Sequence, residues 1–334
     1  MLGSIAIWML VALPISSGQS SSCPAGETQF ESRNFVSAQS LLWDCVLSGE
    51  ADTNSALHLA WTYRELKNYE SGLRKAGFTL QSQPNNENIL YVAAYLQFRQ
   101  GQQNKSLEFL AKAYRLKPDD WRIHQLFALN FIELNMTSYA EQEFLRAIKF
   151  NPTQPEIFYQ LARLYYTQSR FQESIGLSKK ALALAPEYSE VYDNLGLNYQ
   201  AIQDTPRAIE SYTRAIDLNL KREVPDEWPL INYGTFLSQS PERALPILQQ
   251  ALNINAVNPE ANFQMGETLR RLGRDKEAET YFERSIAADP KFARAYYLLA
   301  LLVRKEDPPR SAALIEQFKL LQDQGKKTGV TDLP

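Results

Sequence analysis

Cysteine and histidine are scarce in this chain of 334 residues, which has two of each. Four such side chains do not make a Cys/His zinc cluster without carboxylate ligands, so no metal site is expected. No block of like charge stands out, because 35 basic residues balance 38 acidic residues to a net charge of -3. A nucleic-acid-binding protein normally carries a basic stripe, so no nucleic-acid partner is expected.

The motifs of common catalytic sites are also missing. The sequence contains no H-E-x-x-H metal motif, no G-x-S-x-G nucleophile motif, no Walker loop and no dinucleotide-binding glycine pattern. His58 and His124 fall in separate predicted helices, and we interpret both as structural. The carboxylates of Asp119 and Asp120 fall in a predicted turn, where a helix N-terminus favours negative charge. The chain is predicted not to be an enzyme and to need no cofactor.

Apolar residues make up 44% of the chain, aromatic residues 11% and charged residues 22%. This composition is typical of a chain with a packed core and excludes a wholly disordered protein. The length of 334 residues is enough for two ordinary domains or for one extended array of repeats.

An almost wholly apolar run opens the chain, from Leu2 to Ile15. Its length of about 14 residues is short of the roughly 20 that cross a bilayer as a helix. Because Ser16 and Gly18 form a small-x-small cleavage motif, residues 1–18 are predicted to be a signal peptide. The protein is then exported, either to a periplasm or out of the cell. No Lys or Arg precedes the run, so an uncleaved N-terminal membrane tether and a wrongly assigned start stay open.

Cys23 and Cys45 allow three interpretations. Cys23 follows the apolar run, as the lipid-modified cysteine of a bacterial lipoprotein does, although Ser20-Ser21-Ser22 lacks the usual leucine. In an exported chain the two cysteines are instead a candidate disulfide that staples the N-terminus. Two unpaired thiols, with Cys45 buried as a small apolar residue, are the third interpretation.

The chain repeats with a period of 34 residues. An apolar residue followed by Ala or Gly recurs at this interval at Leu59-Ala60, Ala93-Ala94, Phe127-Ala128, Leu161-Ala162 and Leu195-Gly196. The series continues at Tyr233-Gly234, Met265-Gly266 and Leu299-Ala300, after steps of 38, 32 and 34 residues. A small residue follows twelve positions later in most units, and prolines close several of them. A fixed period of this length is the signature of a repeat architecture.

The period and the residues resemble the tetratricopeptide repeat, which has the pattern W-x2-L-G-x2-Y, then A-x3-F, then P. The unit from Ser189 carries this pattern as Tyr192, Leu195, Gly196, Tyr199, Ala208, Tyr212 and Ala215. The resemblance implies an all-α protein, a right-handed superhelical solenoid of helix-turn-helix hairpins. Proline after the second helix of a unit ends that helix and sets the turn to the next unit.

The resemblance covers residues 53–321. We expect units at 53–86, 87–120, 121–154, 155–188, 189–222, 227–258, 259–292 and 293–321, the first of them degenerate. Residues 19–52 are predicted to cap the array with a single helix, from Asn34 to Leu47. The last helix, Ser311 to Leu321, carries Glu316 and Lys319 on its outer face, as a soluble C-terminal cap requires. Residues 322–334 are predicted to be a mobile polar tail.

The array is irregular at one place. Four extra residues fall in Lys221 to Asp226, and the next unit loses two residues in its turn at 238–241. We expect the slip to alter the local twist and to divide the array into two lobes. Neutral drift is the alternative to a functional bend.

In the tetratricopeptide-repeat family the first helix of each hairpin lines an inner groove that holds a peptide or a helix. Carried over by repeat phase, one candidate partner-binding cluster comprises Tyr91, Tyr95, Phe98, Arg99, Arg122, Tyr159, Arg163 and Tyr166. A second, cationic cluster comprises Arg270, Arg271, Arg294, Tyr297, Arg304 and Lys305. Exposed Tyr and Arg dominate binding hot spots, although Tyr is also ordinary at these positions and Arg is often simply solvated.

The predicted function is a non-enzymatic scaffold that binds a protein or peptide partner in the inner groove. The carboxylate clamp of chaperone adaptors needs Lys and Asn at inner positions, and the chain has Tyr91, Gln125 and Tyr159 there, so that role does not fit. The alternative is an accessory subunit that positions substrate for an envelope enzyme or assembly system, such as glycosyltransferase, outer-membrane or peptidoglycan machinery. Self-association through the groove also stays open.

Overall fold

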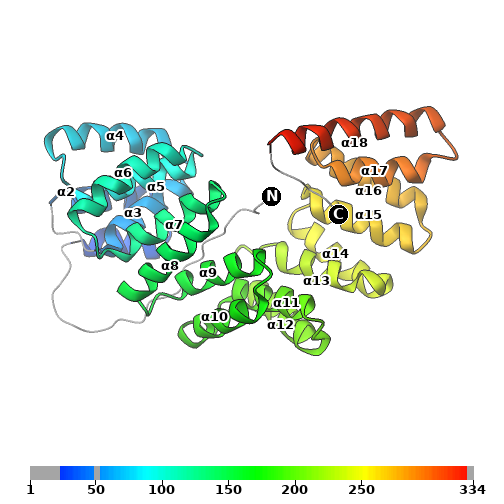
Figure 1. Ribbon diagram of the computed structural model, residues 1–334, viewed down its shortest axis with the longest axis horizontal. Helices are drawn as coiled ribbons and strands as arrows, with labels where there is room; N and C mark the ends of the chain where they lie inside the picture. Colours follow the sequence, from blue (N-terminus) through cyan, green and yellow to red (C-terminus); the bar gives the residue numbers. More distant parts are fainter. Residues whose placement is uncertain (1–22, 49–52, 329–334) are drawn as a thin grey trace. The chain divides into compact units, whose positions relative to one another are not determined.

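The structure is a computed structural model that describes residues 23–48 and 53–328 (Figure 1). Every regular element within these ranges is helical. Successive helices pair as hairpins, so the predicted all-α class and the helix-turn-helix repeat are confirmed. The predicted signal peptide at residues 1–18 lies outside the described ranges.

The helices group into two compact units, one of residues 1–168 with 183–185 and one of residues 169–182 with 186–334. The sequence irregularity at 221–241 led us to expect a division there, and this expectation is wrong. The division falls earlier in the chain, after Gln168, in a part of the array where the period is regular.

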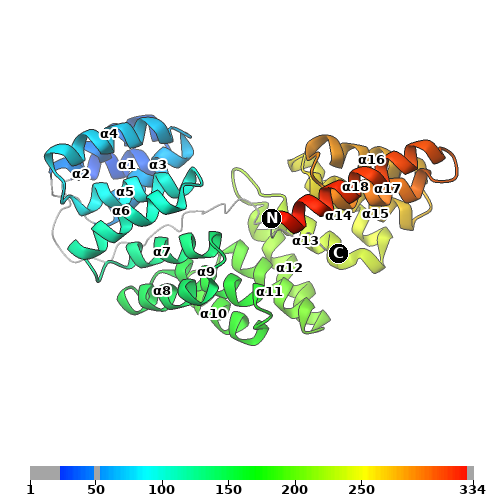
Figure 2. The same cartoon turned by 45° about the horizontal axis from the view of Figure 1, so that its top comes forward.

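Unit 1 contains the N-terminal hairpins (Figure 2). Its helices are α1 (Pro24–Glu31), α2 (Phe35–Ser48), α3 (Thr53–Glu65), α4 (Tyr69–Ser82), α5 (Glu87–Arg99), α6 (Gln103–Leu116), α7 (Trp121–Glu133), α8 (Thr137–Phe150) and α9 (Pro155–Thr167). The two helices of each hairpin pack together, and the second also contacts the first helix of the next hairpin.

Unit 2 continues with the same hairpins. Its elements are α10 (Phe171–Leu184, without the last two residues), α11 (Ser189–Ala201), α12 (Thr205–Asn219), α13 (Trp228–Phe236), the 3-10 turn η1 (Leu237–Gln239), α14 (Pro241–Ile254), α15 (Pro259–Arg271), α16 (Asp275–Ala288), α17 (Ala293–Val303) and α18 (Pro308–Thr328). The shortened turn of the 227–258 unit is the place of η1, which follows α13 directly.

Small residues let the two helices of a hairpin approach closely. A Cβ atom added to Gly196 of α11 would lie 2.5 Å from the ring of Tyr212 in α12. Gly266 stands in the same relation to Phe282, at 2.8 Å. The small-residue positions of the repeat are therefore set by packing, and a larger side chain there would displace an aromatic ring.

Seven of the turns inside the hairpins share one backbone conformation. A residue with positive φ recurs every 34 residues, at Arg33, Lys67, Gly101, Asn135, Ser169 and Gln203, and again at Gly273. Arg33 joins α1 to α2 in this conformation, with φ of 58°. Residues 23–48 therefore hold a helical hairpin with the repeat's own turn, and the prediction of a single capping helix within 19–52 is wrong.

The last hairpin also differs from the prediction. The helix expected at 311–321 begins at Pro308 and ends at Thr328, so the first seven residues of the predicted tail at 322–334 are helical. Ser311 fills the buried small-residue position that the twelve-residue spacing gave to Ala312, and its hydroxyl donates to the carbonyl of Ala300 at 2.8 Å. In the part of the chain that the structure describes, none of the helices is long and apolar enough to span a bilayer.

Candidate functional site

Two tyrosines of the first candidate cluster lie in the core of unit 1. Tyr91 and Tyr95, on α5, are 2% and 3% exposed. The repeat phase predicts both as exposed groove residues, and this prediction is wrong because α5 is buried along most of its length by neighbouring helices. Burial raises the pKa of both hydroxyls well above the usual value for tyrosine. Neither ring offers an open surface to a partner.

Arg122, on α7, is also a core residue, with 1% exposure. Its guanidinium pairs with the Asp120 carboxylate at 2.5 Å and donates to the side-chain oxygen of Asn88 at 3.0 Å. The same guanidinium lies over the ring of Tyr91, with Cζ 4.8 Å from the ring centroid. Asp120 in turn accepts from the backbone N–H of Arg122 and caps α7. The Arg122 guanidinium is bound by groups within unit 1, so the prediction that Arg122 is an exposed anchor for a partner is wrong.

The other members of the first cluster are partly exposed. Phe98 and Arg99 lie in the last turn of α5. Tyr159, Arg163 and Tyr166 follow one another on α9 at spacings of four and three residues, which places them on one face of the helix. The Arg163 guanidinium lies 5.8 Å from the centroid of the Tyr159 ring. We call these three residues the α9 stripe.

Polar side chains join the first helices of neighbouring hairpins within unit 1. The Gln125 amide of α7 donates to Gln160 of α9 at 2.9 Å, and Gln160 donates to Glu156 at 2.7 Å. Arg122 and Asn88 make the equivalent link between α7 and α5. Buried hydrogen bonds of this kind fix the spacing of the helices, because breaking one leaves a polar group unsatisfied.

Two arginines of the second, cationic cluster are held in ion pairs. Arg294 pairs with Glu260 at 2.5 Å and stacks on Phe263 and Phe292, with Cζ 4.7 and 4.9 Å from the ring centroids. Arg271 pairs with Glu267 at 3.0 Å. The remaining three cations, Arg270, Arg304 and Lys305, are exposed.

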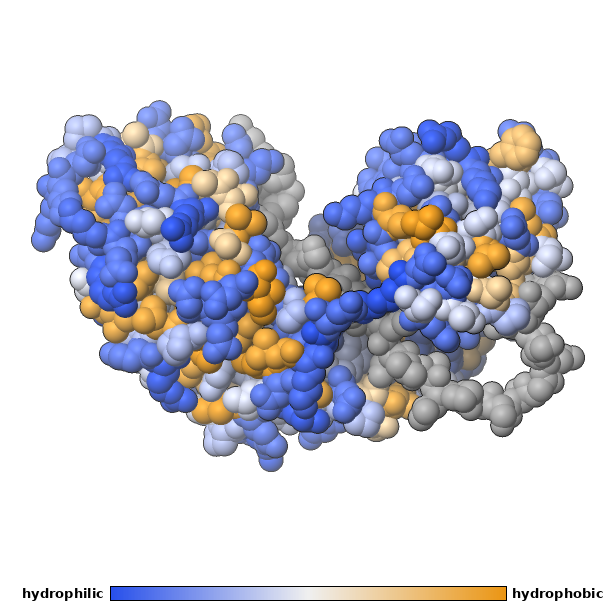
Figure 3. Space-filling model, turned by 180° about the vertical axis from the view of Figure 1, so that it is seen from behind, coloured by the Kyte–Doolittle hydropathy of each residue, from blue (hydrophilic) through white to orange (hydrophobic). Residues whose placement is uncertain are grey.

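Tyr297 is the aromatic member of the second cluster and is 41% exposed. Its ring contacts Phe318 of α18, with 5.1 Å between the centroids. On the face shown in Figure 3, hydrophilic residues surround separate apolar patches. Tyr297, Leu301 and Leu320 each add exposed apolar area to the last hairpin.

His124 is buried and held at both ring nitrogens. Nδ1 lies 2.6 Å from the Glu143 carboxylate and Nε2 lies 2.8 Å from the carbonyl oxygen of Pro118. Both ring nitrogens thus lie within hydrogen-bond distance of an oxygen atom. The ring stacks on Phe150 with 5.3 Å between the centroids. These contacts account for His124 as a structural residue.

His58 lies in α3 and ties it to α1. Its Nδ1 lies 2.5 Å from the Glu27 carboxylate, and its ring stacks on Phe30 at 4.3 Å. Across residues 23–48 and 53–328, no three His, Cys, Asp or Glu side chains are grouped so as to hold a metal ion.

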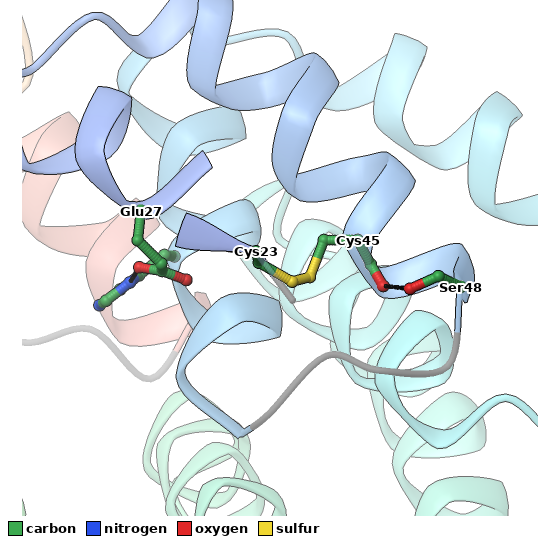
Figure 4. The surroundings of a disulfide bond; sticks show 5 residues. Cys23, Glu27, Cys45 and Ser48 are labelled. Atoms are coloured by element: carbon green, nitrogen blue, oxygen red, sulfur yellow. Dashed lines mark hydrogen bonds and ion pairs between the residues drawn. A yellow bond between two sulfur atoms is a disulfide. The ribbon is translucent and has the colours of Figure 1, made fainter. Parts of the chain in front are cut away.

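Cys23 and Cys45 form a disulfide in the structure, with 5.4 Å between their Cα atoms (Figure 4). The bond joins the residue before α1 to α2, across a sequence separation of 22 residues. Of the three interpretations that the sequence left open, this is the one in the structure. Sequence analysis missed α1 itself, which Phe30 and Glu27 hold against α3.

Family models of the tetratricopeptide repeat match three segments of the chain, residues 87–120, 153–221 and 236–302. Together the three segments span about half of the 334 residues. The first segment covers α5 and α6, the second covers α9 to α12, and the third covers α14 to α16 and most of α17.

Two curated relatives share a similar sequence. The human protein O-mannosyl-transferase TMTC3 is 21% identical over 249 residues, which cover 59% of this chain and 27% of that protein. Anaphase-promoting complex subunit 3 of Schizosaccharomyces pombe (strain 972 / ATCC 24843) is 24% identical over 257 residues, covering 75% of this chain and 38% of that protein. The chain thus spans well under half the length of either relative.

A solved structure with a similar fold is the APC/C hetero-tetramer Cut9-Hcn1. It matches with a TM-score of 0.60 and 14% identity over 89% of this chain and 72% of that one. At this identity the likeness shows the fold alone. The matched segments, the turns that recur every 34 residues and the packing of the hairpins all indicate the same repeat. The chain belongs to the tetratricopeptide-repeat proteins.

Proposed function

We propose that this chain is a non-enzymatic scaffold that binds a segment of a partner protein on the first helices of unit 1. The observation that carries the proposal is the α9 stripe, in which Tyr159, Arg163 and Tyr166 stay partly exposed on one helix face. Tyr and Arg side chains bury a large area on binding at a low cost in conformational entropy and keep a polar group for hydrogen bonding. Phe98 and Arg99 of α5 are a second partly exposed aromatic and Arg pair on a first helix of unit 1.

The buried members of the first cluster support binding indirectly. Arg122 is fixed by Asp120, Asn88 and Tyr91, and Gln125 is fixed by Gln160. These links hold α5, α7 and α9 in place before any partner arrives. A surface that needs no rearrangement loses little free energy to ordering on binding.

Export is part of the proposal. A disulfide persists in an oxidising compartment and is rare in a reducing cytosol, so the Cys23–Cys45 bond supports a periplasmic or secreted protein. The apolar run at Leu2 to Ile15 supports the same location as a signal or a membrane tether. The mass of the mature chain and its distribution on cell fractionation distinguish the two.

A capture experiment tests the binding surface. The chain from Gln19 onward is crosslinked to partners in native extract, beside a variant with Tyr159→Ala, Arg163→Ala and Tyr166→Ala. A second variant, Arg163→Glu alone, changes one side chain and is less prone to unfold than the triple variant. Circular dichroism checks that both variants are folded. The matched control carries Tyr139→Ala and Lys149→Ala on the second helix α8, where both residues are exposed.

We expect one partner set to be captured by the native chain and by the α8 control, and lost with both α9 variants. Capture that is unchanged by the α9 variants would show that the partner binds elsewhere. Capture of the bait alone would favour self-association.

A second candidate function is a substrate-positioning part of a larger enzyme assembly. The match to the human protein O-mannosyl-transferase TMTC3 favours this alternative, since that protein is a transferase by name. The two functions differ in what the α9 stripe binds. Co-purification of an intact transferase with this chain, and loss of its activity with the α9 variants, would support the second function.

A further inference from the structure

The turn between α7 and α8 carries the acceptor motif for an N-linked glycan. Asn135-Met136-Thr137 matches the pattern N-x-[ST], in which the middle residue is not proline. All three residues are exposed, and Thr137 is the first residue of α8. The side-chain amide of Asn135 makes no hydrogen bond to any described residue, so its nitrogen is available for modification.

The backbone of this turn does not require an asparagine. Asn135 has a φ of 57°, and the turns of other hairpins reach the same conformation with unrelated side chains, Arg33, Lys67, Ser169 and Gln203. The hydroxyl of Thr137 is not needed as a cap either, since α8 has no side-chain cap at its N-terminus. The geometry of the turn therefore does not account for this pair of residues.

Apolar side chains flank the motif. Leu134, Met136 and Tyr139 are 37%, 38% and 55% exposed. The ring of Tyr139 lies beside that of Phe131 on α7, with 5.6 Å between the centroids. Exposed apolar area costs free energy in water, and covering it with a group that carries C–H bonds recovers part of that cost.

The equivalent positions are polar in the six other hairpins whose turn has this conformation. One residue after the residue of positive φ, where this turn has Met136, the others have Asn34, Asn68, Gln102, Arg170, Asp204 and Arg274. Four residues after it, where this turn has Tyr139, the others have Ser37, Ser71, Lys105, Glu173, Arg207 and Glu277. Apolar residues at both positions of one turn indicate contact with a group other than water.

We propose that Asn135 carries an N-linked glycan whose first sugars pack on Met136 and Tyr139. The faces of a sugar ring carry C–H groups that pack on apolar and aromatic side chains, while its hydroxyls stay in water. The proposal rests on the proposed export of the chain, because the modification is made on exported proteins.

The attachment is a group transfer without a redox step. The donor is a lipid-pyrophosphate-linked oligosaccharide, and a transferase of the export pathway joins it to the chain. Nδ2 of Asn135 forms a bond to C1 of the first sugar, and the bond from C1 to the pyrophosphate oxygen breaks. The amide loses one proton, and the lipid pyrophosphate leaves.

A second copy of the motif, Asn104-Lys105-Ser106, is an internal comparison. It lies within α6, and Ser106 is fully buried, where its hydroxyl accepts from the Asn130 amide at 3.0 Å. The folded chain therefore withholds the hydroxyl that is part of the motif. We expect a glycan on Asn135 and none on Asn104.

Peptide mass spectrometry on the protein isolated from its own cells tests the site. The peptide that contains Asn135 should carry a glycan, and the peptide that contains Asn104 should not. Among variants made in the same cells, Asn135→Gln and Thr137→Ala should lose the glycan, and Thr137→Ser should keep it. Gln203 holds the same backbone conformation in another hairpin, so Asn135→Gln is compatible with the turn.

Oxidation of Met136 by dilute peroxide tests whether the glycan covers the turn. Formation of methionine sulfoxide depends on the exposure of the sulfur. Removal of the glycan by a peptide N-glycosidase should speed the oxidation of Met136 at least about twofold. Met265, which is buried, should be oxidised slowly in both samples.

The N-terminus of the mature chain and the Cys23–Cys45 bond show in the same samples whether the protein is exported. An unmodified Asn135 in an exported, disulfide-bonded chain would overturn this proposal and leave the proposed function intact. A chain that is not exported would overturn the proposal together with the export on which it rests. Equal occupancy of Asn104 would contradict the argument from exposure, and unchanged oxidation of Met136 would contradict the packing of the sugars on the turn.

Discussion

The guanidinium of Arg122 lies over the ring of Tyr91, 4.8 Å from Cζ to the ring centroid, and both side chains are buried. A cation at this distance from an aromatic face is attracted by the ring, and the attraction is larger in a dry environment. Asp120 completes the arrangement with an ion pair to the same guanidinium. Residues that the repeat phase assigns to the inner face thus stabilise unit 1.

Arg122→Ala should destabilise the protein by about 3–5 kcal/mol, because the Asp120 carboxylate is left buried without its partner. Arg163→Ala, at a partly exposed position of the α9 stripe, should change the free energy of unfolding by about 0.5 kcal/mol or less. Urea denaturation followed by circular dichroism compares the two. Equal effects would contradict the distinction between core and surface arginines.

Gly101→Ala should destabilise by about 1 kcal/mol, because Gly101 has a φ of 72° and a Cβ atom disfavours that conformation. Gly77→Ala is the matched control. Gly77 lies inside α4, where an added Cβ atom meets nothing within 4 Å, so alanine should stabilise the helix by about 0.5–1 kcal/mol. Opposite signs in urea denaturation are the expected outcome, and a shared sign would refute the turn assignment.

Replacing Cys23 and Cys45 by serine should loosen α1 and α2. In the chain-entropy model, a disulfide across 22 residues raises the free energy of the unfolded chain by about 3 kcal/mol, because it reduces the entropy of that chain. Hydrogen exchange of the α1 and α2 amides should become faster in the double variant and in the reduced native protein. Reductant should have no effect on the double variant, and unchanged exchange in all samples would rule out a stabilising bond.

Asp226→Asn should make stability less dependent on acid pH. Burial raises the pKa of Asp226, and Glu227 and Glu190 add to the rise, while the Trp228 N–H and Arg222 oppose it. The folded state therefore binds the proton more tightly than the unfolded state does, so the native protein loses stability as pH rises from about 3.8 through the raised pKa. Asparagine keeps an acceptor for the Trp228 N–H, which Asp226 accepts at 2.9 Å.

Above the raised pKa the Asp226→Asn variant should be at least as stable as the native protein, and below about pH 4 the difference should vanish. Thermal unfolding at a series of pH values measures both limits. A variant that is less stable at neutral pH and equal at acid pH would mean that the carboxylate is stabilised by the fold.

The hairpins were predictable because packing repeats in the sequence. Pairs such as Leu195-Gly196 recur because each hairpin needs a small residue where its two helices meet. In the unit from Ser189, Gly196 leaves room for the ring of Tyr212. Helix α2 was predicted, but α1 was missed because it has eight residues and only Phe30 as a large buried side chain. The turn residue Arg33 has a positive φ but is not a glycine, so the sequence does not indicate the turn.

The candidate site was predictable only in part. Repeat phase places Tyr91 and Tyr159 on equivalent faces of α5 and α9, but exposure depends on neighbours that phase does not describe. Tyr91 is covered from α7 by Arg122, while Tyr159 stays partly exposed beside Arg163.

Site-specific photocrosslinking tests the scaffold account most directly. A photoreactive phenylalanine analogue replaces Tyr166 on α9 in one sample and the exposed Tyr139 on α8 in another, and each is irradiated in native extract. The account predicts a partner crosslinked from position 166 and absent from position 139. A partner crosslinked only from position 139, or none from position 166 in an extract that supports capture, would contradict it.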